Sequence, residues 1–258
     1  MRSRTNASLG FRRAWPTTLA RTLNNILSVL GKLLRIAVKW KVIATMPGAI
    51  ELTKNEKTVH AFYDADAVRR LIDATRNTRE RVLVLLGVHA GLRRGEMCGL
   101  RWIDVDFTQR QIVVRQSVWR NIVGTPKSGH GRVIDLSAEL EQALLAHRHR
   151  RPMVLCAANG AAPTPKRLRD WLADLQERAG LPLPHGGLHV LRHGFCSNLA
   201  ALGAPAKSIQ ELAGHSNLST TLGYMHLSPA TRRAAIGLFD AAGRGTGVAT
   251  LECKNEIP

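Results

Sequence analysis

The sequence predicts a mainly α-helical protein with a small three-stranded antiparallel sheet, and three observations support this. Over long stretches, apolar residues recur at three- and four-residue spacing, which is the period of an amphipathic helix. Only one region, residues 111–136, shows short runs rich in β-branched residues. From Pro165 to Asp240 the pattern is again almost entirely helical.

The N-terminal quarter is expected to hold one long helix and the start of a second. Residues 17–45 show helical spacing of leucine and isoleucine, and the Met-Pro-Gly at 46–48 is expected to end this helix. Proline disfavours helix in the residue before it. Residues 48–60 are expected to form a linker, after which Asp64 is a suitable N-cap for a helix to about Thr75.

The middle of the chain is expected to pass from helix to strand and back. Residues 79–91 predict a buried helix closed by Gly91, and a short helix follows from Glu96 to Leu100. The expected strands are 111–116, 118–123 and 131–136, and a turn with Pro126-Lys127-Ser128-Gly129 precedes the last of them. Ser137 is then expected to cap a helix with acidic residues in its first turn.

Composition suggests three parts with different roles. Residues 1–57 form a basic N-terminal segment, residues 58–241 a mostly helical domain with the sheet, and residues 242–258 a glycine-containing flexible tail. The chain carries a net charge of +18, and residues 1–57 alone hold eleven Lys and Arg against two acids. So large an excess of positive charge indicates a polyanion partner, and its concentration in residues 1–57 suggests an arm that lies on a phosphate backbone.

The spacing of the cysteines and the length of the apolar runs indicate the cellular compartment in which the protein is expected. The four cysteines are widely spaced without a Cys-x-x-Cys pair, which indicates free thiols in a reducing environment. We find no run of eighteen apolar residues, as a membrane span requires, and no convincing secretion signal. The expected location is therefore the cytoplasm.

Six residues form a set suited to attack on a phosphodiester. They are Arg93 in GLRRGEMCGLRW, Lys127 in TPKSGHGR, His189 and Arg192 in LHVLRH, His215 in LAGH, and Tyr224 in TLGYMHLSP. Arginine binds a phosphate through a planar fork and stays protonated, so it can neutralise the charge that develops on the non-bridging oxygens. A phenol has a pKa near 10, so Tyr224 needs activation before it can act as a nucleophile.

Each residue also has a plainer interpretation. Arg94 competes with Arg93, Arg132 is the fallback for Lys127, and Glu96 is expected to support an arginine rather than take part in chemistry. His193 is expected to point away from the site as an ordinary polar helix residue, and Trp102 to pack in the core. A metal site on His185, His189 and His193 is disfavoured, because Pro184 and Gly186-Gly187 break the helix between the first two.

Taken together, these motifs resemble the tyrosine recombinases, also called the phage integrase family. The resemblance covers about residues 17–240 and is continuous through APAKSIQELAGHSNLSTTLGYMHLSP. It implies the α+β catalytic fold of that family and a DNA strand exchange that needs no cofactor and no metal. Only the last helices of the family's N-terminal core-binding domain are recognisable, in TLNNILSVLGKLLRIAVKWKVIATMP, so much of that domain is expected to be missing.

The resemblance also implies a role for each residue. Tyr224 would form a 3′-phosphotyrosyl bond, while Arg93, Arg192 and His215 hold the non-bridging oxygens. His189 would assist proton movement at the nucleophile, and Lys127 would give a proton to the leaving 5′ oxygen. Four protomers would act together on DNA, with a helix near 229–239 docking on a neighbour and an accessory DNA-bending or directionality protein as a further partner.

Two alternatives stay open at this point. A chain without much of its core-binding domain could be a truncated DNA-binding remnant without catalytic activity. A type IB topoisomerase uses similar chemistry, although the Gly-His element before the tyrosine and the small size favour a recombinase.

Overall fold

The computed structural model describes residues 17–53, 62–119, 122–125, 131–157, 159–181 and 187–225. Lys127, the C-terminal segment near 229–239 and the expected tail at 242–258 lie outside these residues. The chain divides into two compact units, Met1–Val59 and His60–Pro258. Each unit is described by itself.

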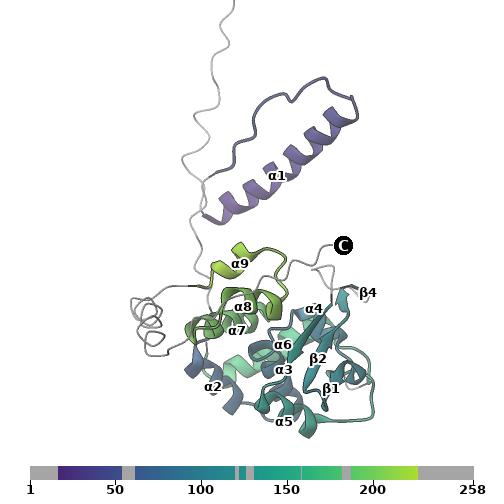
Figure 1. Cartoon of the computed structure of the whole chain (residues 1–258), viewed down its shortest axis with the longest axis vertical. Helices are drawn as coiled ribbons and strands as arrows, with labels where there is room; N and C mark the ends of the chain where they lie inside the picture. The colour runs from purple at the N-terminus through teal and green to yellow at the C-terminus, as the bar shows by residue number, and fades with distance from the viewer. Residues whose placement is uncertain are drawn as a thin grey trace, which may run out of the picture. The chain divides into compact units, whose positions relative to one another are not determined.

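In the first unit, one long helix is followed by a segment that runs back along that helix. Helix α1 spans Thr17–Lys39 and ends six residues before the position expected from the sequence. Lys41 adopts a left-handed backbone with φ 58°, which a helix cannot continue through. The chain then runs back beside α1, where the Asn24 side chain binds both the N–H and the carbonyl of Thr53 at 2.8 Å (Figure 1).

The second unit begins with two capped helices. Helix α2 spans Ala65–Asp73 and α3 spans Thr78–Val88. The Asp64 carboxylate accepts from the Ala67 N–H at 2.8 Å, as the sequence predicted. Helix α3 stops three residues before Gly91, and that glycine takes a left-handed φ of 57° in the loop that leads to α4.

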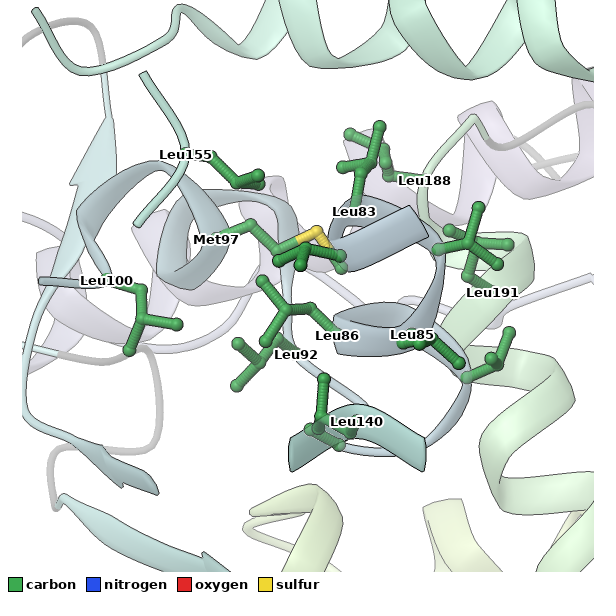
Figure 2. Packing of buried hydrophobic residues seen from close by; sticks show 14 of the residues in the cluster. Leu83, Leu85, Leu86, Leu92, Met97, Leu100, Leu140, Leu155, Leu188 and Leu191 are labelled. Atoms are coloured by element: carbon green, nitrogen blue, oxygen red, sulfur yellow. The ribbon is translucent and has the colours of Figure 1, made fainter. Parts of the chain in front are cut away.

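Helix α3 is the centre of the hydrophobic core. Val82 through Leu86 are fully buried, so every side of the helix faces protein rather than solvent. Figure 2 shows Leu83, Leu85 and Leu86 with side chains from several other elements around them, among them Leu140, Leu188 and Leu191. A Cβ on Gly87 would lie 2.5 Å from the Leu191 Cβ, so glycine is what allows the close approach of α3 to the helix that carries Arg192.

The sheet differs from the one expected. Its strands are β1 (Val105–Asp106), β2 (Gln111–Val114) and β5 (Arg132–Asp135), antiparallel in the order β1-β2-β5. The expected strand at 118–123 is not part of it. Instead β3 (Ser117–Trp119) and β4 (Ile122–Gly124) pair with each other as a separate antiparallel two-stranded sheet.

The remaining helices surround α3 and the sheet. They are α4 (Arg94–Gly99), the short 3₁₀ helix η1 (Trp102–Asp104), α5 (Ala138–His147), α6 (Pro165–Arg178), α7 (His189–Ala201), α8 (Ala206–Ala213) and α9 (Leu218–Leu222). Ser137 caps α5 as predicted, and Trp102 is buried in the core. Helices α7, α8 and α9 lie together in Figure 1, and their packing brings Arg192, His215 and Tyr224 into one place.

No helix in the described part of the chain has both the length and the apolar content that a membrane span needs.

Candidate active site

Three arginines converge on the C-terminal end of α8. Arg132 donates through Nε to the Leu212 carbonyl at 2.8 Å. Arg192 and Arg93 each donate through Nη2, to the carbonyls of Ala213 and Gly214 respectively, both at 2.5 Å. The last carbonyls of a helix lack partners inside the helix and carry the negative end of its dipole, so cations are stabilised there.

Gly214 makes this convergence geometrically feasible. It is the C-cap of α8 and has a left-handed backbone with φ 65°, the usual conformation of glycine after a helix. A Cβ at this position would meet Cδ of Arg132 at 3.0 Å. The glycine therefore both ends the helix and leaves room for a guanidinium against its C-terminus.

Glu96 links two of these arginines. Its two carboxylate oxygens accept from Nη1 and Nη2 of Arg132 at 2.9 Å each, and Oε1 also accepts from Nη1 of Arg93 at 2.8 Å. Burial would raise the pKa of Glu96, but hydrogen bonding and the charge of Arg132, with smaller contributions from Arg93, lower it to about 2. Glu96 is thus an ionised positioning residue, in line with the supporting role expected of it.

The same contacts concern Arg132 as a possible substitute for Lys127, which is expected to give a proton to the leaving oxygen. Arg132 is 7% exposed, and all three of its guanidinium nitrogens donate to Glu96 or to Leu212. All three guanidinium nitrogens are thus engaged within the protein, which favours a role in building the site, while Arg132 as the substitute for Lys127 stays a prediction.

Arg192 is buried and contacts two elements at once. Its Nη1 donates to the Gly91 carbonyl at 2.6 Å, while its Nη2 binds α8. Burial, followed by the charges of Arg93 and Arg132, lowers the pKa of Arg192 to about 10, so it remains a cation at neutral pH. Together the three arginines and Glu96 carry a net charge of +2, which suits an anion such as a phosphodiester.

Arg93 is the more accessible of the arginines expected to bind phosphate. It is the N-cap of α4, and its side chain is 18% exposed. Arg192 is 5% exposed and lies deeper. An entering phosphate would therefore meet Arg93 first, with Arg192 behind it.

His215 follows Gly214 directly and faces Tyr224. Its Nδ1 is 2.9 Å from the Thr221 hydroxyl oxygen, and its ring is stacked on the Tyr224 ring at 8° with centroids 6.1 Å apart. Burial is the main reason that the pKa of His215 falls to about 4, and the charges of Arg192, Arg93 and Arg132 lower it further. At neutral pH His215 is therefore an uncharged imidazole.

Tyr224 lies just beyond α9 rather than within a helix as expected. Its N–H donates to the Thr221 carbonyl at 2.9 Å, which continues the turn past Leu222. Burial, and secondarily the charge of Cys196 when ionised, raise the pKa of the Tyr224 phenol to about 12, against a lowering by Arg192. The phenol is protonated at neutral pH and must lose a proton to attack phosphorus.

The residue that reaches the Tyr224 hydroxyl is His193, for which the sequence suggested no role. Its Nδ1 lies 2.5 Å from the Tyr224 oxygen, so the expectation that His193 points away is wrong. The available signal was its spacing. His193 follows His189 by four residues, and side chains four apart share one face of a helix.

His189 lies at the start of α7 and is exposed. Its ring centroid is 6.4 Å from that of His193, so both histidines belong to the same end of the helix. The structure thus brings together Arg93, Arg192, His215 and Tyr224, with His189 at the edge. Within the described residues, no group of three or more His, Cys, Asp or Glu side chains could hold a metal ion.

The fold thus places a late tyrosine beside a cluster of arginines. The chain belongs to the phage integrase family, whose family model matches residues 61–231. That match includes Arg93, Lys127, Arg192 and Tyr224 within its bounds.

Curated relatives carry the names of tyrosine recombinases. The XerC-like tyrosine recombinase of Caldanaerobacter subterraneus subsp. tengcongensis is 26% identical over 74% of this chain and 56% of its own length. Tyrosine recombinase XerC of Xanthomonas campestris pv. campestris is 30% identical over 72% of this chain and 57% of its own length. The chain thus spans a little over half the length of these relatives.

Solved structures share the fold. The Tn1549 transposon integrase in complex with transposon right-end DNA superposes with a TM-score of 0.73 at 22% identity, over 85% of this chain and 79% of that one. The catalytic domain of bacteriophage HP1 integrase gives a TM-score of 0.54 at 22% identity, over 72% of this chain and 99% of its own. At such identities the likeness establishes the fold.

Proposed function

We propose that the chain is a site-specific DNA recombinase that cuts and rejoins DNA through a 3′-phosphotyrosyl bond on Tyr224. The observation that carries this proposal is the assembly of Arg93, Arg192 and His215 around Tyr224 at the end of α8. An enzyme of phosphoryl transfer needs a positioned nucleophile beside fixed positive charge, and this cluster supplies both.

Each residue has one role in the proposed cleavage. The guanidinium groups of Arg93 and Arg192 bind the non-bridging oxygens, and uncharged His215 donates a hydrogen bond to the same phosphate. Lys127 gives a proton to the leaving 5′ oxygen, and His189 assists at the nucleophile. The energy of the broken bond is kept in the phosphotyrosine, so rejoining needs no nucleotide.

The proposed partners follow from charge and from the family. The net charge of +18 suits double-stranded DNA, and the Tn1549 integrase was solved on transposon DNA. We extend this to a homotetramer on DNA, assisted by an accessory DNA-bending or directionality protein, in a mobile element of a bacterium or phage. The proposed location is the cytoplasm, on the nucleoid. Residues 1–57 would contact DNA as a partial core-binding domain, and residues 58–241 would form the catalytic domain.

Strand exchange between two labelled duplexes tests this function. The duplexes are taken from the sequences that flank the gene, and the reaction runs in EDTA with wild-type protein and with Tyr224→Phe. We expect recombinant duplexes with the wild type alone. Relaxation of supercoiled DNA without exchange would favour a type IB topoisomerase instead, and salt-sensitive binding without any cleavage would favour a DNA-binding remnant.

A further inference from the structure

His193 contacts the proposed nucleophile directly. Nδ1 of His193 and the phenolic oxygen are 2.5 Å apart, and the two rings are tilted by 36° with centroids 5.6 Å apart. His193 is half-buried on α7, one residue beyond Arg192. It is therefore held in place by the same helix that supplies an arginine to the phosphate site.

The phenol needs a proton acceptor because its surroundings oppose ionisation. Its pKa is raised to about 12, first by burial, so the phenolate is scarce at neutral pH. A neutral imidazole nitrogen within hydrogen-bond reach can take the proton as the oxygen attacks. If the imidazole proton of His193 lies on Nε2, Nδ1 is free to accept the hydrogen bond that the phenol donates across this contact.

The other groups around the phenol are poorly suited to this task. His215 presents the face of its ring to the tyrosine, and its Nδ1 is engaged with Thr221. Arg192 is a cation and has no lone pair to offer. Burial is the main cause that raises the pKa of Cys196 to about 11, so it is a thiol at neutral pH. His189 is exposed at the start of α7, with its ring 6.4 Å from that of His193.

We propose that His193 is the catalytic base that accepts the phenolic proton of Tyr224 during DNA cleavage. This inference rests on the proposed function and replaces the vaguer assistance expected from His189. As the tyrosine oxygen bonds to phosphorus, its proton moves to Nδ1 of His193, and the bond from phosphorus to the 5′ oxygen breaks. The 5′ oxygen leaves with a proton from Lys127. In rejoining, Lys127 takes the proton of the attacking 5′ hydroxyl, the bond from phosphorus to the tyrosine oxygen breaks, and the imidazolium of His193 returns its proton to that leaving oxygen.

The contact itself can be tested without DNA. The chain has two tyrosines, so protein labelled with ¹³C at the tyrosine Cζ gives two signals, and Tyr63 serves as the internal reference. The Tyr63 hydroxyl accepts from Gln176 at 2.7 Å and so has a different hydrogen-bond partner. In His193→Ala, the Tyr224 signal and its titration midpoint should shift while those of Tyr63 stay. An unchanged Tyr224 signal would overturn the contact.

Single-turnover cleavage tests the proton transfer. The substrate is a duplex from the gene flanks with a nick near the scissile phosphate, which traps the covalent adduct. His193→Ala should slow adduct formation by about 100-fold or more, the range of a lost general base. His193→Gln keeps an oxygen that can accept the hydrogen bond but cannot take the proton, so it should be equally slow. Added imidazole should restore part of the rate in His193→Ala.

The outcomes distinguish a failure of the role assigned to His193 from a failure of the proposed recombinase function. If the wild type forms an adduct and His193→Gln is as fast, His193 only positions the phenol, and the inference fails while the proposed function stands. If both variants match the wild-type rate, His193 has no part in the step. A wild type that forms no adduct contradicts the proposed function and the role of His193 with it. Equal thermal unfolding midpoints of the variants and the wild type establish that folding is intact.

Discussion

Glu96 shows how a single buried carboxylate organises the site. It is 1% exposed and binds both Arg93 and Arg132, so replacing it by glutamine would set an amide N–H₂ against a guanidinium. Breaking a buried ion pair by removing one partner costs about 3 to 5 kcal/mol. We expect Glu96→Gln to lose that much free energy of unfolding in urea. The matched control is Glu211→Gln on α8, whose carboxylate is 67% exposed and whose loss should change stability by less than about 0.5 kcal/mol.

The pH dependence of stability follows from the same residue. The pKa of Glu96 is lowered from 4.5 to about 2 in the folded protein, so its contribution is present above pH 4.5 and is lost as the pH falls toward 2. The difference in unfolding free energy between wild type and Glu96→Gln should therefore shrink through this window. A difference that stayed constant from about pH 6 to about pH 2.5 would contradict the assigned ionisation.

Residue spacing predicted part of this site and missed another part. Arg93, Arg192, His215 and Tyr224 stand in the order that the chemistry and the family require, and the fold brings them together. The four-residue spacing from His189 places His193 on the same helix face, but its contact with Tyr224 joins positions 31 apart through the path of α8 and α9, which that spacing does not encode. The role of Arg132 was missed for the same reason, because it depends on β5 lying against α8.

At the scale of elements, the C-terminus of α8 is the structure on which the arginines depend. Gly214→Ala would place a Cβ 3.0 Å from Cδ of Arg132 at a left-handed φ of 65°. Gly203→Ala is the matched control, since its φ is 85° but nothing lies within 4 Å of an added Cβ. Both should show the left-handed penalty of about 1 to 2 kcal/mol, measured by urea unfolding. Only Gly214→Ala should also slow DNA cleavage, and equal cleavage by both would contradict the importance of this helix end.

Elements were easier to predict than their ends and pairings. Capping residues such as Asp64 and Ser137 act locally, and both were found at the expected positions. The two-residue strand β1 carries too short a pattern to recognise, and its pairing with β2 depends on tertiary contacts. Helix α1 ends early because Lys41 has a left-handed backbone. Lysine is not a residue type whose presence in a sequence predicts that conformation.

At the scale of the whole molecule, charge divides evenly between the two units. Residues 1–59 carry +9 of the total of +18, while the hydrophobic core of the described residues lies entirely in the second unit. A protein that begins at His60 should therefore fold, and its DNA affinity should depend less steeply on salt than that of the full chain. The slope of log K against log salt falls by about 0.9 for every phosphate that the protein no longer neutralises. Filter binding over a series of salt concentrations measures both slopes, and identical slopes would contradict a role for the first unit on DNA.

The most direct test of the central claim is to locate the covalent bond. Wild-type protein is incubated with labelled duplex from the gene flanks in EDTA, quenched in SDS and digested, and the DNA-linked peptide is sequenced by mass spectrometry. Tyr63→Phe serves as the control, because Tyr63 is 5% exposed and is the other tyrosine in the chain. The account predicts an adduct on Tyr224 in the wild type and in Tyr63→Phe, and none in Tyr224→Phe. An adduct on any other residue, or one that survives in Tyr224→Phe, would contradict it.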